Sequence, residues 1–123
     1  MRRILATIAA LSFLALAGGT AAGAGSVPPF PHLPGAWSHA EINVTIKRTP
    51  HTLILDRGRI VQASSTQLTL READGSLVVV PLAESTIVVL YNRPATVLDL
   101  RKRMNAQTMR IDGGAAVRVR ATF

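Results

Sequence analysis

Few side chains in this sequence of 123 residues could act as nucleophile, acid or base. His51 and Asp56 could form a hydrolase triad with a serine, in which the histidine takes the serine proton and the carboxylate orients the histidine. The candidate serines are Ser64 and Ser65, although any chain with several serines permits such a grouping. A thiol nucleophile is excluded because the chain has no cysteine. We therefore expect a protein that is not an enzyme, and keep a small hydrolase that uses His51 as an alternative.

The seven carboxylates are spread singly along the chain. Asp74 and Asp112 precede glycines in predicted hairpin turns, where aspartate hydrogen-bonds the backbone, and Asp99 fits a helix cap. The other four have no spacing typical of a metal site: Glu41, Asp56, Glu72 and Glu84. We therefore expect no metal ion and no other cofactor.

Basic residues are the most distinctive feature, since 14 Lys and Arg face 7 Asp and Glu and give a formal net charge of +7. Two groups of them could line a cationic stripe, one in the last predicted hairpin and one in the run before it. Such a stripe would bind an anionic polymer or surface. The alternative is a solvated surface that keeps the domain soluble. The predicted ligand-binding residues are Arg110, Arg118 and Arg120, together with Arg101, Lys102 and Arg103.

Nucleic acid is a less suitable partner for this positive charge. Proteins that bind single strands stack the bases on aromatic side chains of their strands. In residues 40–123 the only aromatic residues are Tyr91 and Phe123. We therefore expect no nucleic-acid ligand.

The first 24 residues have the order of a secretory signal peptide: Arg2 and Arg3, then an apolar run over residues 4–17, then small residues. The A-x-A pattern at residues 22–24 predicts cleavage after Ala24, which lowers the net charge from +7 to +5 by removing both arginines. The alternative is an uncleaved anchor, because residues 4–24 carry no charge. We expect export by the general secretory route, to the periplasm or outside the cell, with no transmembrane span after cleavage.

A segment rich in proline and glycine follows the predicted signal over residues 25–39. Prolines at this density prevent helix and sheet ladders, so the segment is predicted to be an extended linker. Its apolar side chains could dock on the domain, but a free tether is the preferred interpretation. His32 and His39 fall within this linker.

The remaining residues, 40–123, are predicted to form one small domain. Residues 40–47 alternate between apolar and polar side chains, and similar segments recur at intervals of about 8 to 12 residues. Asp74-Gly75 is a strong hairpin signal, and Thr96 with Asp99 predicts the cap of a helical turn that continues to Met104. We predict an all-β fold, a small and partly open β-barrel of about six to eight short strands with one short helical turn.

The last hairpin has two possible registers. A two-residue Gly113-Gly114 turn would place Arg118 opposite Met109 and mix the apolar and polar faces. A three-residue loop over residues 112–114 would place Val117 opposite Met109 and keep the apolar face intact. We therefore predict the three-residue loop, with Arg110, Arg118 and Arg120 sharing the outward face.

Several short motifs follow one another between residues 56 and 122. They are Arg57-Gly58-Arg59-Ile60, Leu68-Thr69-Leu70, Asp74-Gly75, Val78-Val79-Val80-Pro81-Leu82, Thr86-Ile87-Val88, Asp99-Leu100-Arg101 before Met104, and Ala116-Val117-Arg118-Val119. With them the chain resembles small exported bacterial β-barrel domains of unknown function, related to OB-folds. The resemblance implies a fold and an exported location, and no established activity. It departs at Arg103, where the usual turn glycine is missing, so this corner is expected to be more helical.

Together these observations predict an exported small β-barrel that acts as a binding or scaffolding module of the cell envelope. The expected ligand is an anionic envelope polymer or surface, and the expected state is a monomer. A second possibility is a subunit whose open sheet edge pairs with another envelope protein.

Overall fold

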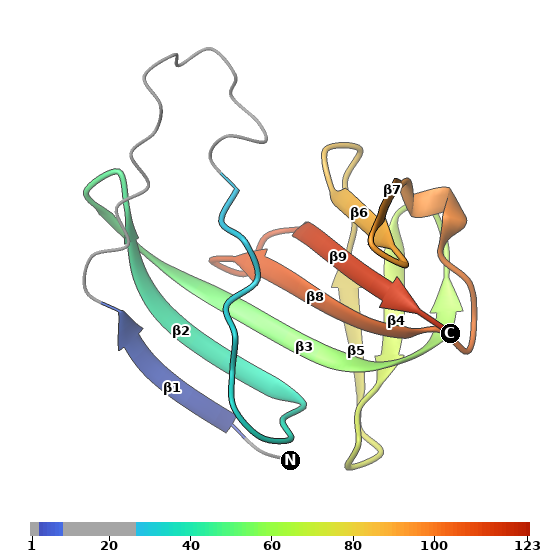
Figure 1. Cartoon of the computed structure of the whole chain (residues 1–123), viewed down its shortest axis with the longest axis horizontal. Coiled ribbons are helices and arrows are strands. Elements are labelled where there is room, and N and C mark those ends of the chain that lie inside the picture. The colour runs from blue at the N-terminus through green and yellow to red at the C-terminus, as the bar shows by residue number, and fades with distance from the viewer. Residues whose placement is uncertain (1–2, 9–26) are drawn as a thin grey trace.

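The computed structural model describes residues 3–8 and 27–123, which form one sheet and a single 3-10 turn (Figure 1). The strands are β1 (Arg3–Ile8), β2 (His39–Ile46), β3 (Thr49–Ala63), β4 (Gln67–Arg71), β5 (Leu77–Pro81), β6 (Ile87–Leu90), β7 (Arg93–Ala95), β8 (Asn105–Ile111) and β9 (Ala116–Thr122), and the turn η2 spans Val97–Asp99. Within these residues no helix is long and apolar enough to cross a membrane.

Strand β3 lies at the centre of the sheet, and one of its two edges pairs with two different strands. Its residues 53–59 pair with β8, so β8 occupies one edge. The other edge pairs with β2 through residues 49–56 and with β4 through residues 59–63. The start of β2 and the end of β4 therefore meet along β3 at Arg57 and Gly58.

The face that β3 buries changes along its length. Leu53 and Leu55 pack into one apolar cluster, which lies between β2, β3 and β8. The side chain of Ile60 points to the opposite face of the strand, and it packs into a second cluster with β4, β5, β6, β8 and β9. Between them lie Asp56 and Gly58, so a polar segment of the strand occupies the point where burial changes sides.

The all-β prediction is confirmed, and the sheet closes only in part. The second cluster holds β4 and β5 against β6, β8 and β9, as side chains of all five strands share one core. Among the described strands β5 pairs only with β4, and β7 pairs only with β6. Strand β1 likewise pairs only with β2, so three strands of the described sheet have an open edge.

The helical turn is shorter than predicted. Its capping box is present, since Thr96 N donates to Asp99 Oδ2 at 2.9 Å. The turn ends at Asp99 rather than continuing to Met104. Arg103 has a φ of 77°, the left-handed conformation that glycine usually supplies, so this corner is not more helical.

The proline-rich segment packs on the sheet and is not a free tether in its described part. Residues 27–38 cross the face of β2, β3 and β8 in Figure 1. Val27, Phe30, Leu33 and Trp37 pack against the apolar cluster of that face. Apolar burial against the strands therefore outweighs the extended character of the prolines.

The last hairpin combines the two registers considered above. Arg110 pairs with Ala116, which requires the predicted three-residue loop. A bulge then places Arg118, not Val117, opposite Met109, so the predicted register is wrong beyond the loop. Since side chains alternate along β8, Arg110 lies on the face opposite to Arg118, and the three arginines do not share one face.

The predicted signal peptide lies mostly outside the described residues. Arg3–Ile8 form β1, which pairs in parallel with β2 from His39 to Val44. Residues 9–24 and the predicted cleavage point are not among the described ones. Export and cleavage after Ala24 stay predictions.

Candidate functional site

The groups of the possible hydrolase triad are not brought together. His51 Nδ1 bonds Asp112 Oδ2, while the Asp56 carboxylate bonds a different histidine, His39. The Ser64 hydroxyl is used in its own turn, where it contacts Thr66 and the carbonyl of Gln67. No described contact links His51 to Asp56 or to either serine.

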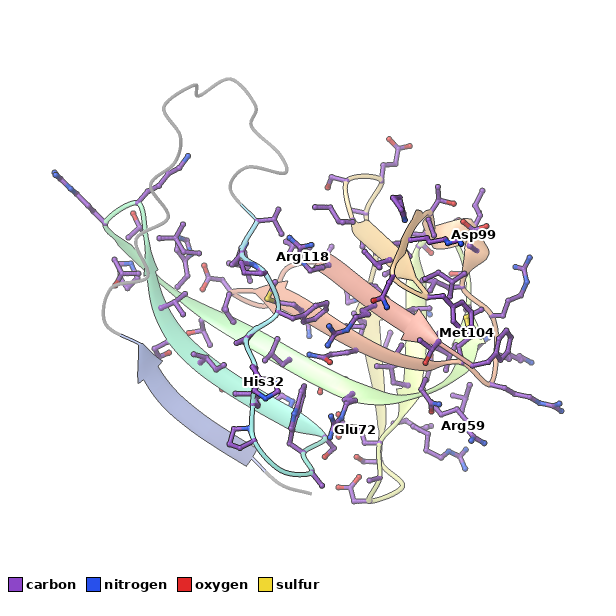
Figure 2. The ribbon with its side chains drawn as sticks, in the orientation of Figure 1. His32, Arg59, Glu72, Asp99, Met104 and Arg118 are labelled. Carbon is purple, nitrogen blue, oxygen red and sulfur yellow. The ribbon has the colours of Figure 1, made fainter. Side chains whose placement is uncertain are left out.

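The arginines of the last hairpin are bound to the backbone and side chains of the chain itself. Arg110 donates to the carbonyls of Gly113 and Gly114 and so braces its own loop. Arg118 donates to the carbonyls of Val27 and Pro28, and lies beside this segment in Figure 2. Arg120 donates to Gln107 Oε1 and stacks 5.0 Å from the centre of the Phe30 ring. We conclude that Arg118 and Arg120 bind the segment of residues 27–38 to the sheet.

The second predicted group, Arg101, Lys102 and Arg103, lies exposed on the loop between η2 and β8. These residues line an open hollow of about 770 Å³ together with Phe123. Tyr91 packs against Phe123, with ring centres 6.5 Å apart. The structure thus brings the two aromatic residues of the barrel together beside the basic run.

A third group of arginines surrounds a larger hollow, which we call the arginine groove. It has a volume of about 840 Å³ and lies where β2 and β4 meet along β3. Arg59 on β3 and Arg71 on β4 are direct cross-strand partners. Both side chains are exposed, and among the described residues neither forms a hydrogen bond or an ion pair. The groove is lined by Ala36, Trp37, Ser38, Arg57, Gly58, Arg59, Arg71, Ala73, Asp74 and Asn105.

Arg57 is the fixed member of this groove. Its guanidinium lies 4.5 Å from the centre of the Trp37 ring, and its Nε donates to the Trp37 carbonyl at 3.1 Å. Trp37 is itself 6% exposed and belongs to the apolar cluster. A buried indole therefore holds one of the cations that line the groove in place.

A polar cluster lies at the same junction, on the other face of β3. His39, the first residue of β2, is the cross-strand partner of Asp56. Its Nδ1 lies 2.7 Å from Asp56 Oδ1, and its Nε2 lies 2.9 Å from Glu41 Oε2. Carboxylates only accept hydrogen bonds, so both contacts are satisfied when the imidazole carries two protons.

The hydrogen bonds of this cluster favour the charged histidine. Burial of the ring opposes the positive charge and lowers the pKa of His39. The hydrogen bonds and charges of Glu41 and Asp56 outweigh this effect and raise the pKa overall. His39 was predicted to lie in the linker, but it belongs to the sheet.

Glu72 completes the cluster from the β4–β5 hairpin (Figure 2). Asp56 is 1% exposed and Glu72 is 4% exposed. Burial, together with the hydrogen bond and charge of Asp56, raises the pKa of Glu72 to about 7. A proton on Glu72 can be shared with Asp56, but when both carboxyls are ionised Asp56 Oδ2 and Glu72 Oε2 have no hydrogen-bond donor among the described residues.

Sequence reasoning missed both sites, because each joins residues that are far apart in the chain. One signal was available. A glycine inside a strand often marks a close approach of another backbone. Gly58 is such a residue: an added Cβ would lie 2.4 Å from the Arg71 carbonyl oxygen.

Comparison with known protein families, with curated proteins and with solved structures finds no match to this chain. The assignment of a function therefore depends on the contacts and charges of its own residues.

Proposed function

We propose that the protein is an exported binding module of the cell envelope whose ligand is an anionic polymer, held in the arginine groove. The predicted ligand class is retained, while the proposed surface moves from the last hairpin to Arg57, Arg59 and Arg71. The observation that carries this proposal is the direct pairing of Arg59 with Arg71. Like charges placed opposite each other in a sheet are destabilising, and a bound anion would relieve this repulsion.

The position of the groove also supports a polymeric ligand. It is an open hollow on the surface and not an enclosed cavity, so it does not limit the length of a bound chain. Guanidinium groups bind sulfate, phosphate and carboxylate with paired hydrogen bonds. Arg57 is held in place by Trp37, which lowers the entropy lost on binding.

The test uses heparin, a sulfated polysaccharide, as a probe of anionic polymers. Replacing both Arg59 and Arg71 with serine is expected to lower heparin affinity at about 0.1 M salt by roughly tenfold or more. The slope of log affinity against log salt should fall by about 2, since two ion contacts are lost. Both quantities are measured by titration at several salt concentrations.

A matched control removes two charges elsewhere. The double variant Arg101→Ser with Lys102→Ser has the same net charge as the groove variant, and these side chains lie on the loop before β8. It should keep most of the affinity. An equal loss in both variants would show attraction by net charge alone, and a larger loss in the loop variant would assign binding to the Arg101–Arg103 run.

A second candidate function is a subunit that pairs with a partner through an open edge. Strand β5 pairs only with β4 among the described strands, and it exposes Leu77 (58%) and Val79 (51%). An exposed apolar edge strand is a template for another chain.

Lysine at this edge should prevent such pairing. Val79→Lys is expected to abolish co-purification of a partner from the native envelope fraction, because a charged side chain on an edge strand opposes strand addition. Leu98→Lys, at a residue that is 68% exposed on the 3-10 turn, is the control and should leave co-purification unchanged. A partner retained by both variants would exclude the β5 edge.

A further inference from the structure

We propose that His39, Asp56 and Glu72 form a binding site for a divalent transition-metal ion such as Zn²⁺, with Glu41 orienting the histidine. This site is distinct from the arginine groove and does not depend on it. It lies at the junction of β2, β3 and the β4–β5 hairpin, on the face of β3 opposite to Arg57 and Arg59.

The ligand atoms are already close together. One nitrogen of His39 and one carboxyl oxygen each from Asp56 and Glu72 lie within 4.8 Å of one another. Ligand atoms at the usual distance of about 2.1 Å from one zinc ion lie roughly 3 to 4 Å apart. Movements of side chains alone would therefore close the site around an ion.

Buried oxygens without donors point to a cation. Asp56 and Glu72 are almost fully buried, yet with both carboxyls ionised Asp56 Oδ2 and Glu72 Oε2 lack a donor among the described residues. A buried carboxylate without a partner is costly. A divalent ion between the two carboxylates would satisfy both oxygens and neutralise their repulsion.

The arrangement around His39 is the one that metal-bound histidines use. In such sites one ring nitrogen binds the ion, while the other donates its proton to a carboxylate that fixes the ring. Glu41 Oε2, 2.9 Å from Nε2, occupies the second position. Nδ1 then faces Asp56 Oδ1 at 2.7 Å, and an ion bound to both atoms would take the place of their hydrogen bond.

The ligand set limits the kind of ion. One imidazole and two carboxylates suit Zn²⁺ or Mn²⁺ better than a copper(I) site, which needs sulfur, or a calcium site, which needs six or more oxygens. Three protein ligands leave one position open on a tetrahedral ion. The sequence predicted no metal because its acids have no metal-site spacing, whereas the ligands here come from different strands and meet only in the fold.

The experiment is calorimetric titration of Zn²⁺ into the full chain at pH 7.5, after chelator treatment, with thermal unfolding measured in parallel. We expect one Zn²⁺ per chain and a rise in Tm on its addition, because the ion binds the folded state alone. Asp56→Asn and Glu72→Gln should each weaken binding at least tenfold, and Glu41→Ala should weaken it by about tenfold or more through the loss of histidine orientation.

His51→Gln is the matched control, since His51 also pairs with a carboxylate but lies near the start of β3, five residues before Asp56. It should bind Zn²⁺ as tightly as the unchanged chain. Circular dichroism establishes whether each variant is folded. If Asp56→Asn unfolds, Glu72→Gln still tests the site, because glutamine keeps the shape of the glutamate side chain. The proposal is overturned if Zn²⁺ does not bind, if Glu72→Gln binds it equally well, or if binding is lost in His51→Gln.

Discussion

Gly58→Ala is expected to destabilise the protein by about 3 kcal/mol or more, an effect at the upper end for overpacking. The new Cβ would lie 2.4 Å from the carbonyl oxygen of Arg71, 2.9 Å from its carbonyl carbon and 3.3 Å from the Cα of Glu72. All three are backbone atoms, so no side-chain rotation relieves the clash. The end of β4 must move away from β3, which breaks the junction that both candidate sites share. Urea-induced unfolding measures the loss.

Gly114→Ala provides the comparison for this prediction. Its added Cβ would lie 3.4 Å from the carbonyl oxygen of Ile111, which is close to ordinary contact. The expected loss is below about 1 kcal/mol. If the two alanine variants unfold at the same urea concentration, the close approach of β4 to Gly58 does not determine stability.

Most of the fold follows from local chemistry, and the sequence could therefore predict it. The alternation over residues 40–46 corresponds to β2, and Asp74-Gly75 forms the predicted β4–β5 hairpin, in which Gly75 has a φ of 87°. Asp99 caps the 3-10 turn as expected. Each of these features depends on residues within a few positions of one another.

Other turns could not be predicted because their residues lack the usual signal. Lys47 and Arg48 adopt positive φ values of 50° and 67° and connect β2 to β3 in a two-residue turn. Tyr91 and Asn92 do the same between β6 and β7. Pairing of the flanking strands imposes these conformations, against the local preference of the side chains.

The candidate sites depend on contacts that no local pattern contains. His39 and Asp56 are 17 residues apart, and they meet because β2 pairs with the first half of β3. Glu72 joins them because β4 pairs with the second half of the same edge. The predicted common face of Arg110, Arg118 and Arg120 is wrong for a related reason: the bulge in β9 and the docked segment 27–38 decide which groups Arg118 meets.

Raising the pH from about 5 to 8 is expected to destabilise the metal-free protein, by about 2.5 kcal/mol from Glu72 alone. Glu72 has a pKa of about 7 in the folded state against 4.5 as its ordinary value, so the unfolded chain loses this proton first as the pH rises. The pKa of His39 is also raised, and its stabilising contribution, complete below pH 6.5, is lost as the pH passes its folded pKa. Both groups therefore act in the same direction, and they face Glu41, Asp56 and Ser76. Thermal unfolding with a chelator present should give a Tm about 10 °C higher at pH 5 than at pH 8.

Glu72→Gln separates the contribution of the Asp56–Glu72 carboxyl pair to this pH dependence from the contribution of His39. A glutamine cannot ionise, and its amide can donate to Asp56, so the variant should be more stable than the unchanged chain at pH 8 and nearly equal to it at pH 5. The loss of stability between pH 4.5 and 7 should disappear, while the loss from His39 above pH 6.5 remains. Glu84→Gln, at an exposed carboxylate, should keep the full pH dependence. A Tm of the unchanged chain that rises from pH 5 to pH 8 would contradict a raised pKa of Glu72 in the folded protein, because such a pKa makes ionisation of the buried carboxyl destabilising over this range.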